Sequence, residues 1–112
     1  MVKEIRSRLG DSVYSIREDE TLEMAVVELL KKYDLTVTTA ESCTGGLLAG
    51  RLVNVPGASE VFREGVITYS NKAKRKLLDV NKSTLKKYGA VSEQTAREMA
   101  MGGVFATDAD AC

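Results

Sequence analysis

The segment best suited to chemistry is Ala40-Glu41-Ser42-Cys43-Thr44-Gly45-Gly46, which is rich in small and hydroxylated residues. It follows a short β-branched run and precedes a helical pattern, so unpaired backbone N–H groups at a helix start would favour an anion there. Either Ser42 or Thr44 could donate a hydrogen bond to a phosphate oxygen, or one of them could be a nucleophile. The plainer alternative is that one hydroxyl caps the helix and that the two glycines allow close packing.

A second chemical segment, Thr68-Tyr69-Ser70-Asn71-Lys72-Ala73-Lys74, also lies where a strand ends and a helix begins. The carboxyl ends of parallel strands form the ligand crevice of an open α/β sheet. If the two strands are parallel neighbours, this segment and the Ser42 turn face the same crevice. Lys74 then stands about one helical turn in, where a lysine, or a tyrosine near it, can activate a serine. The other cations are expected to form a solvated helical face: Lys72, Arg75 and Lys76.

The chain contains no histidine, and this excludes several kinds of site. A Ser-His-Asp triad, a Cys-His pair and a His-ligated metal centre cannot be built from these residues alone. Acid–base chemistry must therefore use Lys, Tyr, Asp, Glu or Cys. Cys43 could act as a thiol nucleophile at a helix start, but we favour a buried structural role for it. We expect neither a metal nor a cofactor.

The hydrophobic periodicity indicates helices that alternate with strands. A helix begins near Thr21, and one stripe of it is expected to be buried: Leu22, Ala25, Val26, Leu29, Leu30 and Tyr33. Strands are expected over 35–40 and 65–70, and further helices over 47–53, 71–78, 83–88 and 93–106. Asn71 and Ser92 are the expected N-caps and Gly89 an expected helix end, while residues 108–112 resemble the approach to another strand. This order predicts a three-layer α/β domain with a mostly parallel sheet that is incomplete in this chain.

Residues 1–20 differ from the rest, because charges are mixed there with scattered apolar residues. We expect them to be a linker from a preceding domain, with a short strand or linker segment around 11–16 followed by a loop. Residues 21–112 are expected to form the domain itself.

The composition argues against several classes of partner. Lys plus Arg and Asp plus Glu each number 16, so a net charge of zero gives no overall attraction to nucleic acid or to an anionic membrane. The chain has no Trp, four Tyr and two Phe, so a base-stacking surface is not expected. No stretch approaches the roughly 20 apolar residues of a membrane helix. Two cysteines without a CxxC pair or a secretory leader predict reduced thiols and a cytoplasmic location.

Three motifs in order resemble the C-terminal domain of the CinA family of competence- and damage-inducible proteins. They are AESCTGG, VPGASEVFREGVITYSNKAK and YGAVSEQTAREMA, and the resemblance runs from about Thr21 to Cys112. The family implies an amidohydrolase that converts nicotinamide mononucleotide to nicotinic acid mononucleotide and ammonia.

The resemblance also implies roles for individual residues. Ser42 is the expected nucleophile, Lys74 the expected base, and Tyr69 the expected assisting group. The expected substrate-binding residues, which line an oxyanion hole or hold the nucleotide, are Thr44, Gly45, Gly46 and Asn71.

The sequence departs from the family pattern in two places. The family continues into a strand and a glycine-rich TGIAGP segment that this chain lacks, and it commonly has an acidic residue where this chain has Lys72. Residues 5–14 resemble the connector to the N-terminal domain of the family, so we expect fusion to such a domain in the longer protein. The missing strands leave an open sheet edge, which favours a homo-oligomer. Two alternatives to the enzyme remain, namely a nucleotide-binding module without turnover and a fragment that assembles through its open edge.

Overall fold

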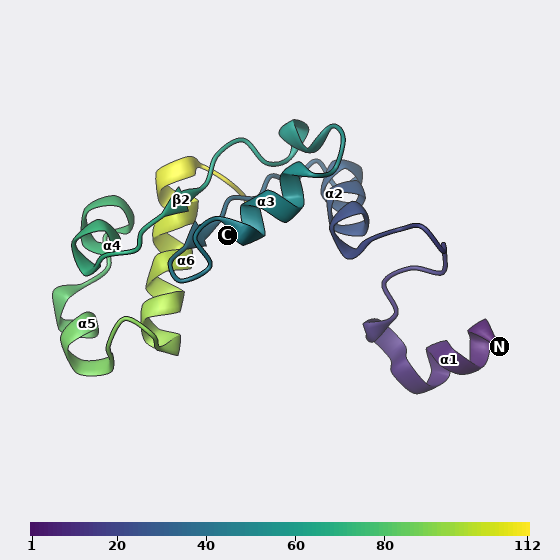
Figure 1. Ribbon diagram of the computed structural model, residues 1–112, viewed down its shortest axis with the longest axis horizontal. Coiled ribbons are helices and arrows are strands. Elements are labelled where there is room, and N and C mark those ends of the chain that lie inside the picture. Colours follow the sequence, from purple (N-terminus) through teal and green to yellow (C-terminus); the bar gives the residue numbers. More distant parts are fainter.

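Two short parallel strands form the centre of the fold in the computed structural model, which describes residues 1–112 (Figure 1). β1 (Ala40–Glu41) pairs with β2 (Val66–Ile67), and Ala40 lies opposite Val66. The parallel direction confirms the expectation that the two strand ends point to the same edge. Regular pairing is shorter than the sequence pattern predicted.

The segment that ends in β1 has a neighbour on each side. Val37 forms one parallel bridge with Phe62 and another with Ala111. The Asp110 carboxylate accepts hydrogen bonds from the Thr36 backbone N–H at 2.8 Å and from the Thr36 hydroxyl at 3.0 Å. The tail therefore approaches the sheet as a further parallel segment, as expected.

Helices form most of the remaining regular structure: α1 (Val2–Leu9), α2 (Leu22–Lys32), α3 (Leu47–Val53), α4 (Asn71–Leu78), α5 (Lys82–Tyr88) and α6 (Glu93–Thr107), with 3-10 turns η1 (Gly10–Ser12) and η2 (Ala58–Glu60). Figure 1 shows α1 apart from the other helices, at the end of the molecule opposite α4 and α5. None of the helices has the length and apolar character that a membrane crossing would require.

Two small apolar clusters flank the strands. The first joins α2, α3 and η2: Val27, Leu52, Ala58 and Val61, with Val37 packed against it. The second joins α4, α5 and α6: Leu78, Val80, Leu85 and Met99, with Ala40 and Val66 packed against it. Side chains alternate between the two faces of a strand, so Val37 and Ala40 support opposite layers. The arrangement is an α/β fold with helices on both sides of a small parallel sheet.

Most predicted helix ends are confirmed. The Thr21 hydroxyl accepts from the N–H of Met24, the Ser92 hydroxyl accepts from Thr95, and Gly89 ends α5 with φ 81°. The expectation that Asn71 caps α4 is wrong by one residue. Ser70 is the cap, because its hydroxyl accepts from the Ala73 N–H at 3.0 Å.

The N-terminal region contains no strand around 11–16, so of the two alternatives for this segment the strand is excluded. α1 has no buried residue, and Arg17 links the following segment to α2 through ion pairs with Glu20 and Glu28. The role of residues 1–20 as a linker stays a prediction.

The predicted buried stripe of α2 is largely exposed. Ala25 and Val27 are buried, whereas four stripe residues are exposed: Leu22, Val26, Leu29 and Tyr33. The reason is that α2 packs against the cluster with α3 through Val27 and, partly, Leu30, so the cluster covers only part of the stripe. Part of the exposed side borders an apolar groove of about 220 Å³ whose walls include Leu48 of α3 and Cys112.

Candidate active site

Ser42 and Lys74, 32 residues apart in the sequence, meet at the carboxyl edge of the sheet. Ser42 follows β1 directly and is half-buried, and Lys74 lies in the first part of α4 with only 1% of its surface exposed. The Lys74 Nζ lies 3.0 Å from the Ser42 Oγ, which is hydrogen-bond distance. The parallel pairing of β1 with β2 brings their two turns together, as the sequence predicted.

Two backbone carbonyls orient the Lys74 amine. Its Nζ donates to the carbonyl of Thr68 at 2.7 Å and to that of Tyr69 at 3.4 Å. A carbonyl oxygen can only accept, whereas the Ser42 hydroxyl can both donate and accept. The Nζ also donates to the Ser42 Oγ, so three oxygen atoms surround the amine. This geometry suits a base that removes the hydroxyl proton.

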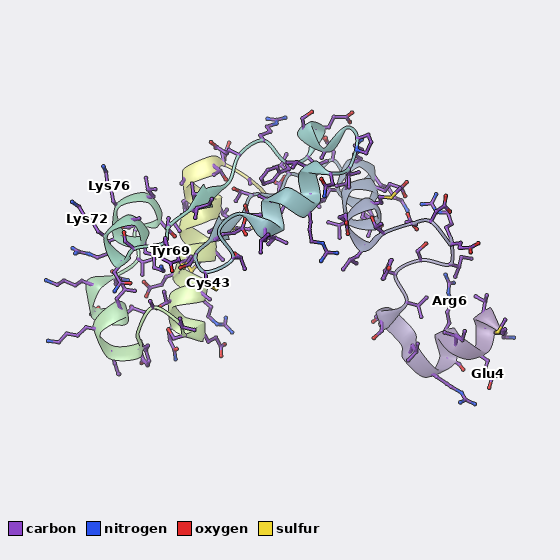
Figure 2. The ribbon with its side chains drawn as sticks, viewed as in Figure 1. Glu4, Arg6, Cys43, Tyr69, Lys72 and Lys76 are labelled. Atoms are coloured by element: carbon purple, nitrogen blue, oxygen red, sulfur yellow. The ribbon has the colours of Figure 1, made fainter.

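Tyr69 contacts Lys74 through its main chain. Its side chain is 77% exposed, and Figure 2 shows it at the β2–α4 connection. The carbonyl of Tyr69 therefore holds the amine, while the assisting role of its hydroxyl stays a prediction.

Cys43 is exposed, which corrects the expectation that it is buried. The residue follows Ser42 in a turn that leaves the sheet, so its side chain has no layer to pack against. Figure 2 shows Cys43 on this turn, in the half of the molecule that also contains Tyr69.

Glu41 is a site residue that the sequence analysis missed. Its carboxylate is buried and accepts hydrogen bonds from the backbone N–H of Leu48 at 2.9 Å and of Ala49 at 3.1 Å. Burial acts to raise the pKa of Glu41, but these amides, together with the Thr44 hydroxyl and the Gly46 amide, outweigh burial and hold the pKa below its ordinary value. The sequence did contain a signal for this role, namely an acidic residue just before the start of a helix, where backbone N–H groups favour a negative charge.

Glu41 therefore corrects the idea that the N–H groups at the start of α3 are open to a substrate. Leu48 and Ala49, in the first turn, already donate to a carboxylate of the protein. The amides nearest the nucleophile differ: the Gly45 N–H donates to the Ser42 carbonyl at 3.0 Å, whereas the amides of Cys43 and Thr44 make no hydrogen bond within the protein.

The four predicted substrate-binding residues all lie on the two turns. Thr44, Gly45 and Asn71 are exposed, and Gly46 is half-buried. Gly46 has φ 100°, and a Cβ there would lie 3.2 Å from the Ile67 side chain, so a larger residue would strain the turn. Their contacts with a substrate stay predictions.

Replacing Glu41 by glutamine tests how much its charge supports this turn. The pKa of Glu41 is lower in the folded protein than in the unfolded chain, where it is near 4.5. The ionised carboxylate therefore stabilises the fold above pH 4.5, and this stabilisation is lost as the pH falls through the folded pKa. We expect the Glu41→Gln variant to be less stable than the wild type at pH 7 by about 1–3 kcal/mol. The difference in the free energy of unfolding between the variant and the wild type, measured by urea unfolding, should shrink at a pH well below 4. An equal difference at both pH values would show that charge is not the cause.

The comparisons with known proteins identify the family of this chain. The family model described as the CinA C-terminal domain matches residues 19–112. A competence-damage inducible protein of Clostridium novyi is 60% identical over 108 residues, which are 96% of this chain and 26% of the relative. A CinA-like protein of Kosmotoga olearia is 60% identical over 100 residues, which are 89% of this chain and 24% of the relative. The chain thus spans about a quarter of the length of these relatives.

Solved structures support the same assignment. A CinA superfamily protein of Escherichia coli has a TM-score of 0.78 and 36% identity, covering 91% of this chain and 62% of that one. A competence/damage inducible protein of Agrobacterium tumefaciens has a TM-score of 0.75 and 44% identity, covering 80% of this chain and 53% of that one. This chain belongs to the CinA C-terminal domain family.

Proposed function

We propose that this chain carries the nucleophile and the base of an amidohydrolase whose substrate is the carboxamide of nicotinamide mononucleotide. The observation that carries the proposal is the 3.0 Å contact between Ser42 Oγ and Lys74 Nζ, with the amine held by two carbonyls. The choice of substrate comes from the family resemblance.

In the proposed reaction, Lys74 takes the hydroxyl proton as Ser42 Oγ attacks the carboxamide carbon. The oxyanion that forms needs hydrogen-bond donors, and the free amides of Cys43 and Thr44 are the nearest on the turn. Lys74 then gives its proton to the departing ammonia, leaving an acyl-enzyme on Ser42. Water then attacks the acyl carbon as Lys74 accepts its proton, and Lys74 returns that proton to Ser42 Oγ as nicotinic acid mononucleotide is released.

A second candidate is a nucleotide-binding module without turnover. The chain covers 53–62% of the two solved relatives described above, so residues outside it could complete the substrate pocket in the longer protein. The two candidates differ in one measurable property, which is the release of ammonia.

A pair of neighbouring variants tests the proposed nucleophile. Ser42→Ala should lower ammonia release from nicotinamide mononucleotide by about 10⁴-fold or more, because no other group forms the acyl-enzyme. Cys43→Ser is the matched control and should keep the activity, because Cys43 contributes only its backbone amide. The assay is run on this chain and on a longer chain that spans the whole domain of the solved relatives.

Three outcomes decide between the candidates. Activity that survives in the Ser42→Ala variant would overturn the mechanism. Activity lost in Cys43→Ser instead would point to a thiol nucleophile. A thermal shift caused by the nucleotide without ammonia release in either chain would assign the binding module.

A further inference from the structure

The charges of this chain are unevenly distributed although they cancel overall. Residues 71–88, which form α4, α5 and their connection, contain seven of the 16 cations and only one of the 16 acidic residues, Asp79. The rest of the chain holds the remaining nine cations and fifteen acids. Although the net charge of the whole chain is zero, residues 71–88 are net positive and the rest of the chain is net negative.

Six of these cations form an exposed group that we call the basic surface: Lys72, Arg75, Lys76, Lys82, Lys86 and Lys87. The seventh, Lys74, is buried at the candidate active site. None of the six takes part in an ion pair. The ion pairs of the molecule use other cations: Arg8, Arg17, Lys31, Arg51 and Arg97. The charge of the basic surface is thus not neutralised by the protein.

Helical spacing gathers these side chains. Lys72, Arg75 and Lys76 are three and four residues apart, so they share one face of α4, and Lys82 and Lys86 share a face of α5. Figure 2 shows Lys72 and Lys76 pointing away from the rest of the molecule, at the end that carries α4 and α5. A partner can reach this face without disturbing Lys74, which points inward.

The composition of the surface indicates the kind of partner. The only large apolar side chains exposed on these two helices are Leu77 and Tyr88, so there is little to insert into a membrane. Tyr88 is the one aromatic residue in residues 71–88, so the surface offers little area for stacking on bases. Several unpaired cations close together match a regular array of phosphates.

We propose that the basic surface binds the phosphate backbone of nucleic acid, without sequence preference. This goes against the expectation drawn from the zero net charge, because net charge does not record where the charges lie. Such binding depends on phosphate neutralisation and should weaken steeply with salt. The logarithm of the association constant should fall against the logarithm of salt concentration with a slope of about −0.9 for each phosphate contacted.

The test measures binding of this chain to a short fluorescent duplex DNA by anisotropy, over about 50 to 200 mM salt. The triple variant Lys72→Gln, Arg75→Gln, Lys76→Gln should bind at least about tenfold more weakly and reduce the slope by about three. The matched control, Lys3→Gln, Arg6→Gln, Arg8→Gln on α1, changes the net charge equally and should bind like the wild type. If circular dichroism shows that the α4 variant is unfolded, Lys82→Gln, Lys86→Gln, Lys87→Gln on α5 takes its place.

Each other outcome overturns the proposal. No binding at the lowest salt would show that the surface is only solvated. Equal loss in the α4 and α1 variants would show an effect of net charge alone. Tighter binding to polyglutamate, or to vesicles containing phosphatidylserine, than to DNA would assign the surface to an acidic protein or to a membrane.

Discussion

Replacing Lys74 by arginine is expected to slow ammonia release by about 10²- to 10⁴-fold, the range that loss of a general base produces. Arginine can donate to the carbonyls of Thr68 and Tyr69, which in the wild type accept from the Lys74 Nζ. A guanidinium has no accepting lone pair, so it cannot take the proton of Ser42. The variant therefore separates proton acceptance from hydrogen bonding.

Lys74→Met is the complementary variant, because it removes the amine and keeps a long apolar side chain. The two carbonyls then lose a buried partner, and we expect the free energy of unfolding to fall by about 1–3 kcal/mol in addition to the loss of activity. Initial rates of ammonia release and urea unfolding are measured for both variants. A Lys74→Arg protein with a tenth or more of the wild-type rate would exclude Lys74 as the base.

Gly102→Ala is expected to have the largest effect on stability. A Cβ at residue 102 of α6 would lie 2.7 Å from the carbonyl carbon of Leu78 and 2.8 Å from its Cα, at the end of α4. Both atoms belong to the backbone, so no side-chain rotation relieves the clash and the two helices must separate. We expect a loss of about 1–3 kcal/mol or more. The shift of α4 should also move Lys74 away from Ser42 and lower the activity.

Gly50→Ala provides the matched control, since it is the same substitution inside α3. A Cβ at residue 50 would meet nothing within 4 Å. Alanine favours a helix over glycine, so this variant should be stabilised by up to about 1 kcal/mol. Urea unfolding of the two variants gives the comparison. A Gly102→Ala protein as stable as Gly50→Ala would show that the contact between α4 and α6 adapts freely.

The pairing of Ser42 with Lys74 was predictable because it follows from local rules. Each residue lies just beyond a β-branched run, and parallel neighbouring strands end at the same edge. The absence of histidine narrowed the possible bases further. The caps at Thr21 and Ser92 and the end of α5 at Gly89 also depend on short-range hydrogen bonding, so the sequence alone predicts them.

The parts that sequence could not predict depend on contacts that residue types and hydrophobic periodicity do not determine. Glu41 reads as an ordinary polar residue until the fold brings its carboxylate to the amides of Leu48 and Ala49. Hydrophobic periodicity predicts that the stripe of α2 is buried. Periodicity shows which side chains share a face of a helix, but it does not show whether another element covers that face. The two carbonyls that orient Lys74 belong to the backbone, which is the same in every residue, so the sequence does not identify them.

The bridge between Val37 and Ala111, together with the hydrogen bonds between Thr36 and Asp110, has a consequence for the order of folding. These contacts join residues 74 apart in the chain, whereas α4, α5 and α6 are consecutive elements that pack on one another. Closing so long a loop is slow, and it must wait until a ribosome has made residues 110 and 111. The strand that leads to Ser42 is therefore secured on both sides only after the residues that follow α6 have been made.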